Sequence, residues 1–236
     1  MDEHAQTLGW ASPCRLGGAP SMTTKGACMF DAKPIVLVVD DDVSVRESLK
    51  LLVESAGWEA ETFGSALEFL SRPRVQGPSC LVLDLALPDL SGLDLQRLVS
   101  DRTDLPIIFI TGHADVPTTV RAMKGGAVEF LTKPFLDGVL VSAIRSALNR
   151  SCAAVRQAAE AQRLHDCYAS LSRREREVMT LIVSGRLNKQ AGGELGISEI
   201  TVKAHRGKMM RKMNAGSLPD LVRMADRLCL TPALKH

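Results

Sequence analysis

The sequence predicts an α/β fold with a doubly wound, five-stranded parallel sheet, followed by a small all-α domain. Through residues 34–148, short apolar runs alternate with amphipathic segments, a pattern typical of alternating strands and helices. Several of the apolar runs end directly in an acid, a hydroxyl or a lysine. Beyond residue 168 only helical patterns remain, and a glycine turn separates two of them.

Length and composition are those of a soluble globular protein with roughly two domains. The chain has 236 residues, of which 45% are hydrophobic and 24% charged. No apolar run is long enough to span a bilayer and the first residues do not resemble a signal peptide, so we expect no membrane contact and a cytoplasmic location. The six cysteines are scattered without metal-ligand spacing, which favours free thiols over a metal cluster.

Charge is distributed unevenly along the chain. From residue 168 to the end there are 13 Lys and Arg against 6 Asp and Glu, whereas the rest has 16 against 21. An acidic N-terminal part and a basic C-terminal part indicate that the two parts bind different partners. The basic part is either a nucleic-acid-binding domain or a merely solvated basic surface.

The predicted elements begin after an N-terminal tail. Residues 1–33 contain Gly, Pro and Ser without periodicity and predict a disordered tail, within which Met22 or Met29 is an alternative start. A strand is predicted at 35–39, and a capping box at Ser44–Glu47 opens a helix that stops at Gly57. An edge strand at 59–62 and a helix at 65–70 follow.

Three further strand–helix units complete the predicted sheet domain. The third strand, 80–84, ends in Asp84, and its helix begins at Ser91. The fourth strand ends at Thr111, and the fifth leads into Lys133. The remaining ranges are strands 106–110 and 128–131 and helices 116–124 and 139–148.

A helical linker is predicted over residues 149–167, where sparse apolar spacing allows a weak coiled coil between two copies. Residues 168–236 then form the basic helical domain. A capping box at 172–175 opens its first helix, and a second helix spans 189–195. Gly196 and Ser198 suit a left-handed turn and the cap of a third helix, so we predict a helix-turn-helix. The last helix, from Ser217, carries an apolar face: Leu218, Leu221, Val222, Ala225 and Leu228.

Three carboxylates are predicted to share one edge of the sheet. Asp40 and Asp41 end the first strand and Asp84 ends the neighbouring third strand, and ligands bind at this carboxyl edge in open parallel sheets. Like charges so close repel unless a cation lies among them, and an all-oxygen site suits Mg²⁺. Beside Mg²⁺, Asp84 can act as a nucleophile toward a phosphoryl group. Alone, such an Asp would more often cap a loop.

Two other strand ends supply donors for phosphoryl oxygens. Thr111 offers a hydroxyl and Lys133 an ammonium group. Each alone is more often structural. Together with the acids they predict a site for phosphoryl chemistry.

These residues resemble the receiver domains of two-component response regulators, which have a flavodoxin-like fold. The resemblance covers residues 34–148 and rests on four motifs: Val39–Asp42, Leu83–Pro88, Ile110–Asp115 and Phe130–Phe135.

The resemblance assigns roles to individual residues. It implies that Asp84 accepts phosphate from a sensor histidine kinase and that Thr111 and Phe130 form a switch pair. When Thr111 turns inward, Phe130 enters the vacated space and the surface of the fourth helix and fifth strand repacks. The bond before Pro134 resembles the family's cis peptide. The implied Mg²⁺ ligands are Asp40, Asp41, Asp84 and the carbonyl of Ala86.

Residues 171–228 resemble the LuxR-type helix-turn-helix domain of NarL/FixJ regulators. The matching segments are Leu171–Glu175, Asn188–Lys189, Leu195–Ser198 and Thr201–Arg206. A helical wheel places Val202, Met209 and Met213 in the core, and Ile200, Lys203, Ala204, Gly207 and Arg211 opposite, toward a major groove. Lys203 can reach a base or phosphate, Ala204 a thymine methyl, and the other cations the backbone. The predicted DNA-binding residues are Lys189, Ser198, Ile200, Thr201, Lys203, Ala204, Arg206, Lys208 and Arg211.

Three glycines depart from the family pattern. Gly192 and Gly193 lie inside the second helix, where each costs about 1 kcal/mol relative to Ala. Gly207 removes a side chain from the face that we expect to meet DNA.

The resemblance implies a phosphorylation-controlled transcription regulator, by analogy an activator, and not a metabolic enzyme. We expect the phosphorylated protein to form a homodimer, bind promoter DNA and act with RNA polymerase. One alternative is a stand-alone phosphatase or phosphotransferase using Asp84. Another is a constitutive DNA-binding protein whose receiver serves only to dimerise. The last helix is expected to join the paired DNA-binding domains, or else to pack wholly within its own domain.

Overall fold

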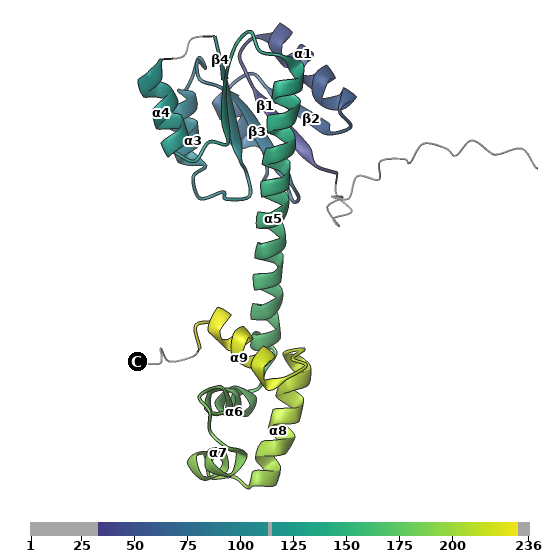
Figure 1. Ribbon diagram of the computed structural model, residues 1–236, viewed down its shortest axis with the longest axis vertical. Coiled ribbons are helices and arrows are strands. Elements are labelled where there is room, and N and C mark those ends of the chain that lie inside the picture. Colours follow the sequence, from purple (N-terminus) through teal and green to yellow (C-terminus); the bar gives the residue numbers. More distant parts are fainter. Residues whose placement is uncertain (1–32, 113–114, 231–236) are drawn as a thin grey trace, which may run out of the picture.

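The computed structural model describes residues 33–112 and 115–230. Apart from Lys33, the expected disordered tail lies outside these ranges, as do His113 and Ala114 of the third motif. An α/β domain and a helical domain lie at opposite ends of one long helix (Figure 1).

The α/β domain contains a five-stranded sheet in which all neighbouring strands are parallel, in the order β2-β1-β3-β4-β5. The strands are β1 (Ile35–Val39), β2 (Glu59–Phe63), β3 (Ser79–Asp84), β4 (Ile107–Thr111) and β5 (Glu129–Thr132). Val39 pairs with Leu83, and Thr111 with Thr132. The predicted fold class is therefore confirmed, and the strand ends that carry the acids, Thr111 and Lys133 share one edge.

Helices cover both faces of the sheet. They are α1 (Val43–Ser55), α2 (Ala66–Ser71), α3 (Gly92–Leu98), α4 (Val116–Lys124) and α5 (Asp137–Ala169). Val36 and Val38 of β1 pack in one core with α1 and α5, while Leu37 and Val39 pack in a second core with α2, α3 and α4. This alternation follows from the two-residue period of a strand, and it makes β3, buried throughout, the centre of both cores.

The first helix begins two residues earlier than the predicted capping box. Asp42 is the N-cap: its Oδ1 accepts the backbone N–H of Ser44 at 2.8 Å. The prediction of a Ser44 cap is therefore wrong, because Asp is an equally good cap and stands first in the chain.

Helix α5 is continuous over 33 residues, about 50 Å at the usual helical rise. The predicted division of this helix at residue 148 is wrong, because no glycine or proline interrupts it there. Ser151 ties it to the base of the sheet. The buried Ser151 hydroxyl accepts the Ser79 N–H at 2.9 Å and donates to the carbonyl of Asp104.

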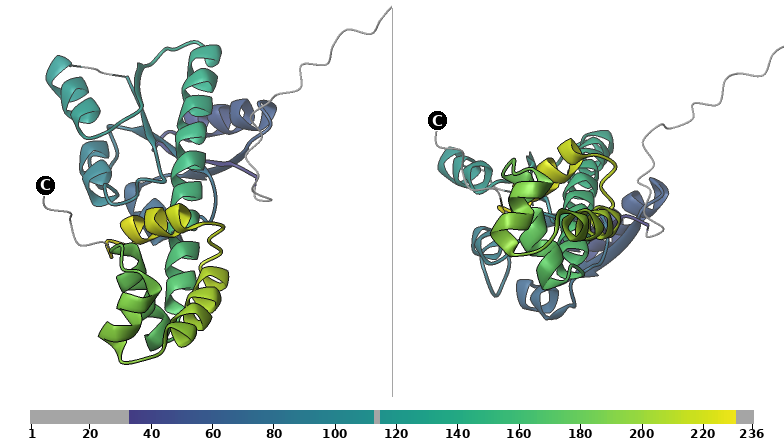
Figure 2. Two further views of the ribbon diagram at one scale, coloured as in Figure 1. Left: turned by 60° about the horizontal axis from the view of Figure 1, so that its bottom comes forward. Right: turned by 90° about the horizontal axis from the view of Figure 1, so that it is seen from below.

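The C-terminal domain consists of α6 (Arg173–Val183), α7 (Asn188–Leu195), α8 (Glu199–Lys212) and α9 (Leu218–Arg227). Its core gathers Met179, Met209 and Leu221 around Leu164, which comes from the end of α5. Helix α9 crosses α5 there (Figures 1 and 2). The long helix thus ends inside the core of the second domain.

The turn between α7 and α8 explains one of the unexpected glycines. Gly196 has a φ of +66° and caps α7, as predicted. A Cβ on the buried Gly192 would lie 2.8 Å from the carbonyl oxygen of Ile197, whereas one on Gly193 would meet nothing within 4 Å. Gly192 therefore allows the turn to approach the helix closely, whereas packing explains neither Gly193 nor Gly207, where a Cβ would also meet nothing within 4 Å.

None of the helices in the described ranges combines the length and apolar character needed to cross a membrane. Cys80, Cys167 and Cys229 are free thiols. Cys152 is disulfide-bonded, which corrects the expectation of free thiols for that residue.

Candidate functional site

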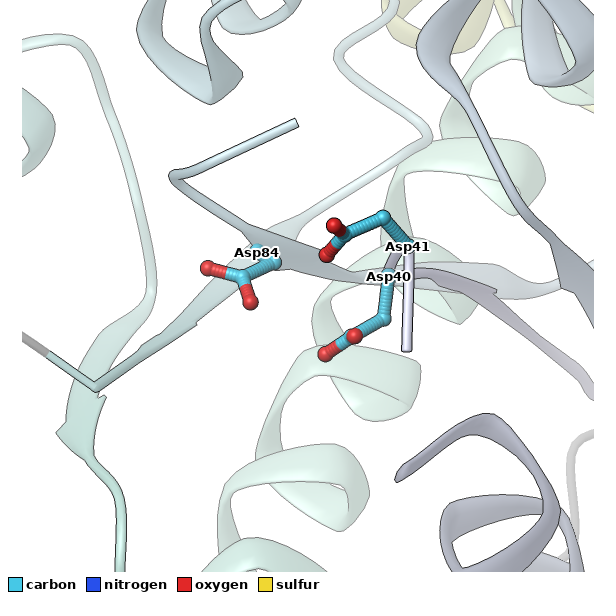
Figure 3. A group of neighbouring side chains, drawn as sticks. All are labelled: Asp40, Asp41 and Asp84. Atoms are coloured by element: carbon cyan, nitrogen blue, oxygen red, sulfur yellow. The ribbon is translucent and has the colours of Figure 1, made fainter. Parts of the chain in front are cut away.

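The three predicted carboxylates come together at the carboxyl edge of the sheet (Figure 3). One oxygen from each of Asp40, Asp41 and Asp84 lies within 4.8 Å of the others. Asp40 is fully buried, Asp84 is 7% exposed, and Asp41 faces solvent. They line a cavity of about 550 Å³ together with Ala86 and Thr111. The site is therefore open to a ligand on the side of Asp41.

Lys133 links two of the carboxylates. Its Nζ lies 2.6 Å from Asp40 Oδ2 and 2.9 Å from Asp84 Oδ2. Burial would lower the pKa of Lys133, but hydrogen bonds to the two carboxylates outweigh it and the pKa is raised. Burial raises the pKa of Asp40, although the bonds from Lys133 and the Asp42 N–H oppose it. Lys133 therefore stays a cation within the pocket.

Backbone groups fix the carboxylates in place. The Asp42 N–H donates to Asp40 Oδ1 at 2.9 Å, and the Ala86 N–H donates to Asp84 Oδ1 at 3.1 Å. Behind Asp84, the Gly92 N–H donates to the carbonyl of Leu85. A Cβ at Gly92 would lie 2.5 Å from the Asp84 carbonyl oxygen, so α3 begins directly against the strand end. This role of Gly92 was not predicted from the sequence, because only the fold brings the two backbone segments together.

The donors in the pocket fit Mg²⁺. Carboxylate oxygens are the hard ligands that this ion prefers, and the open side leaves room for water or a phosphoryl oxygen. Ala86 is exposed and lines the same cavity, as the resemblance to receiver domains requires of a carbonyl ligand. The cis bond between Lys133 and Pro134, also implied by that resemblance, is confirmed.

The two predicted switch residues lie on adjacent strands. Thr111 is 3% exposed and lines the cavity, and its carbonyl accepts the Lys133 N–H at 2.7 Å. Phe130 is half-buried, with its ring 6.2 Å from that of Phe109, its partner in β4. The cavity and the surface beside α4 are therefore only one strand apart.

A second candidate site is the outer surface of α8. Val202, Met209 and Met213 are buried, which confirms the core stripe given by the helical wheel. Arg206 is half-buried and approaches Asn188 Oδ1 at 3.3 Å, and Thr201 is also half-buried. The other predicted DNA-binding residues are exposed: Lys189, Ser198, Ile200, Lys203, Ala204, Lys208 and Arg211.

Both domains match known protein families. Residues 36–145 match the family model of the response regulator receiver domain, and residues 169–225 match that of the luxR family of bacterial regulatory proteins. The chain is a two-component response regulator with a LuxR-type DNA-binding domain.

Relatives of this response regulator match most of its length. Nodulation protein W of Bradyrhizobium diazoefficiens is 52% identical over 201 residues, which are 83% of this chain and 87% of the relative. The response regulator protein TodT of Pseudomonas putida is 45% identical over 85% of this chain and 88% of its own. The solved structure of the response regulator StyR has a TM-score of 0.75 at 49% identity, covering 83% of this chain and all of StyR.

The last helix of the response regulator differs from one expectation. Leu221 and Ala225 are fully buried in the core of their own domain, so they cannot join two copies. Leu218 is 37% exposed and Val222 half-buried. The apolar face of α9 therefore serves mainly its own domain, where it packs on the end of α5.

Proposed function

We propose that this response regulator is phosphorylated on Asp84 by a sensor histidine kinase, and that phosphorylation pairs two copies on promoter DNA. The observation that carries the proposal is the meeting of Asp84, Asp40 and Lys133 in one pocket, in a chain whose other domain exposes a basic helix. A receiver joined to a DNA-binding domain fits a regulator rather than a metabolic enzyme.

The pocket residues would act together in phosphoryl transfer. A carboxylate oxygen of Asp84 attacks phosphorus, the new P–O bond forms as the P–N bond to the kinase imidazole breaks, and the imidazole keeps the electron pair and takes up a proton. The ammonium of Lys133 contacts the transferred oxygens. We assign Asp40, Asp41, Asp84 and the carbonyl of Ala86 as the ligands of Mg²⁺. When bound there, the ion supplies positive charge that screens the repulsion between anions.

Phosphorylation would be sensed one strand away. The Thr111 hydroxyl turns toward the phosphoryl group, and the ring of Phe130 moves into the space that it leaves. The neighbouring helix α4 exposes Val116, Val120 and Met123, an apolar surface suited to a second copy once β5 has repacked. A dimer can bind two DNA half-sites. Once one copy is bound, the second copy is held near its half-site at a high effective concentration, so the affinity for DNA rises without any new residue contact.

The C-terminal domain would place α8 in the major groove. Its exposed cations and the Ser198 end of the helix meet phosphates and base edges. At a promoter, the paired regulator would act on RNA polymerase as an activator.

Two other functions have less support. An enzyme of the phosphatase type needs a free general acid, but the further acids lining the pocket, Asp42 and Asp115, are engaged as N-caps of α1 and α4. A receiver used only for dimerisation would not need the bonds that hold Asp40, Asp84 and Lys133 in place.

Intact-mass measurement tests the proposal. The full chain incubated with acetyl phosphate and Mg²⁺ should gain one phosphoryl group, sediment as a dimer and bind a two-half-site duplex more tightly. Asp84→Asn keeps the size of the side chain and removes the nucleophile, so uptake should vanish with the fold intact. Labelling at an unchanged rate would exclude Asp84 as acceptor. A labelled monomer with unchanged DNA affinity would exclude coupling by dimerisation.

A further inference from the structure

The outer face of α8 carries an apolar patch. Ile200, in the first turn of the helix, is 79% exposed. Ala204 is also exposed and lies one turn further along the helix, so the two side chains are neighbours. The rotation of the helix is fixed because Val202 and Met209 are fully buried. Ile200 and Ala204 are therefore held away from the core.

Polar groups near the patch are already occupied. The Ser198 and Thr201 hydroxyls lie 2.8 Å apart, and Ser198 Oγ accepts the Thr201 N–H. Lys203 Nζ lies 3.0 Å from Glu199 Oε1. Gly207, on the same face, has no side chain, and a Cβ there would meet nothing within 4 Å. Between Lys203 and the Ser198 end of the helix, the first two turns of this face therefore offer methyl groups.

Exposed cations on α8 and α7 identify the occupant of the patch. Lys208 and Arg211 follow Ala204 along the same face of α8, and Lys189 is exposed on the neighbouring helix α7. Positive charge beside an apolar patch complements the phosphates that border a DNA groove. An apolar protein partner would have to approach between these charges, whereas a major groove brings phosphates to the cations and base edges to the patch.

We infer that Ile200 and Ala204 contact the 5-methyl groups of thymines, so that the half-site carries thymine beneath the first two turns of α8. The inference rests on the proposed DNA-binding function and adds the chemistry of base reading. The thymine methyl is the apolar group that the major-groove edges present, and it distinguishes a T·A pair from the others. Ile200 becomes a specificity-determining residue for this regulator.

Thymine-to-deoxyuridine substitution tests this directly, because it removes the methyl and keeps base pairing. A duplex is first selected from a random pool with the full chain treated with acetyl phosphate and Mg²⁺. Each thymine is then replaced singly, and Kd is measured by fluorescence anisotropy at fixed salt. At one or two positions the wild type should lose roughly fourfold in affinity, the loss expected for one apolar carbon.

Variants locate the effect. Ile200→Ala should bind the thymine duplex more weakly than the wild type and lose the methyl dependence at its position, while Ile200→Val should keep most of it. Lys189→Ala is the matched control: it should weaken all duplexes about equally and keep the methyl dependence, as removal of a phosphate contact does. Leu98→Ala removes an exposed apolar side chain in the receiver and should change nothing.

The possible results distinguish a failure of the thymine-methyl inference from a failure of the proposed DNA binding. If no duplex is enriched or bound, DNA binding fails and the inference with it. If a duplex is bound but no thymine shows a methyl effect in the wild type, DNA binding stands and the inference is wrong. Equal methyl effects in the wild type and Ile200→Ala would assign the reading to another residue and also overturn it.

Discussion

The acidic pocket at the sheet edge and the outer surface of α8 are built in opposite ways. In the pocket, Asp40 and Asp84 are buried, each accepts a backbone N–H, and both bind Lys133. On α8, the side chains opposite the core stripe are exposed. A reaction needs groups fixed before the substrate arrives. A DNA-reading surface can instead be ordered by the DNA, so its residues need only a rigid helix beneath them.

The long helix α5 joins these two kinds of site. At one end it covers a face of the sheet, and at the other Leu164 enters the core of the C-terminal domain. Helix α8 and the receiver lie at opposite ends of it (Figure 1). The receiver therefore leaves α8 uncovered, which supports the proposed control by pairing of two copies.

The largest effect is expected when a carboxylate of the acidic pocket is removed. Asp41→Ala removes one exposed carboxylate from the three, so Mg²⁺ affinity in a titration should fall at least about tenfold, since even changes in outer-shell partners of metal ligands cost that much. Glu47→Ala, an exposed acid on α1, removes the same charge and should leave the affinity nearly unchanged. Equal losses in both variants would mean that Mg²⁺ responds to general charge and not to a built site.

The next largest effect is expected when the hydrogen bonds that attach α5 to the receiver are removed. Ser151→Ala leaves the Ser79 N–H and the Asp104 carbonyl without their partner, and unpaired buried groups of this kind cost about 1–3 kcal/mol. The free energy of unfolding in urea should fall by that amount, and the Ser79 amide should exchange faster. Ser146→Ala, an exposed position of the same helix, is the control. Unchanged exchange at Ser79 would show that this bond does not hold the helix.

Two adjacent glycines should give changes of opposite sign in the C-terminal domain. Gly193→Ala adds a methyl group in open space and should raise the free energy of unfolding by up to about 1 kcal/mol. Gly192→Ala places its Cβ against the Ile197 carbonyl and should lower it by about 1–3 kcal/mol. Urea unfolding can be followed at Tyr168, the single tyrosine, which packs on this core. Equal changes in both variants would contradict the close approach.

Local signals allowed most of the fold and pocket to be predicted. Apolar runs ending in Asp40, Asp84 and Thr111 indicate strands whose ends meet, because parallel strands share a carboxyl edge. The order of strands and helices follows, and apart from the end of α5 the boundaries shift by at most two residues. Helix α8 could also be predicted from local signals, because Ser198 caps it and the spacing of its apolar residues places Val202 in the core.

What could not be predicted depends on contacts between distant segments. Gly92 and Gly192 matter through the backbone that approaches them. Ser151 matters through its bonds to backbone groups that lie 47 and 72 residues away in sequence. The apolar face of α9 gives the same pattern whether it meets its own core or a second copy. Asp42 and Ser44 are competing caps that sequence alone does not rank.

The smallest expected effect concerns a buried carboxylate outside the pocket. Glu175 is 3% exposed, and its Oε2 accepts Lys212 Nζ at 2.7 Å and the Ser172 N–H at 2.8 Å. The hydrogen bond from Lys212, followed by that from Ser172, lowers the pKa of Glu175 below its ordinary value of 4.5. Lys212 is 40% exposed, so solvent screening limits the gain.

A lowered folded-state pKa fixes the sign of the pH dependence. Above the ordinary value the carboxylate is charged in both states and its full contribution to stability is present. As the pH falls through 4.5 the unfolded chain binds a proton first, and the contribution is lost by the time the pH has passed below the folded-state pKa. Urea unfolding at Tyr168 should therefore show the wild type losing more stability than Glu175→Gln between neutral pH and pH values below 4.5. Because Glu177 and Asp220 also have lowered pKa values, only the difference between the two proteins reports on Glu175, and parallel curves would mean that the Lys212 bond adds no pH-dependent stability.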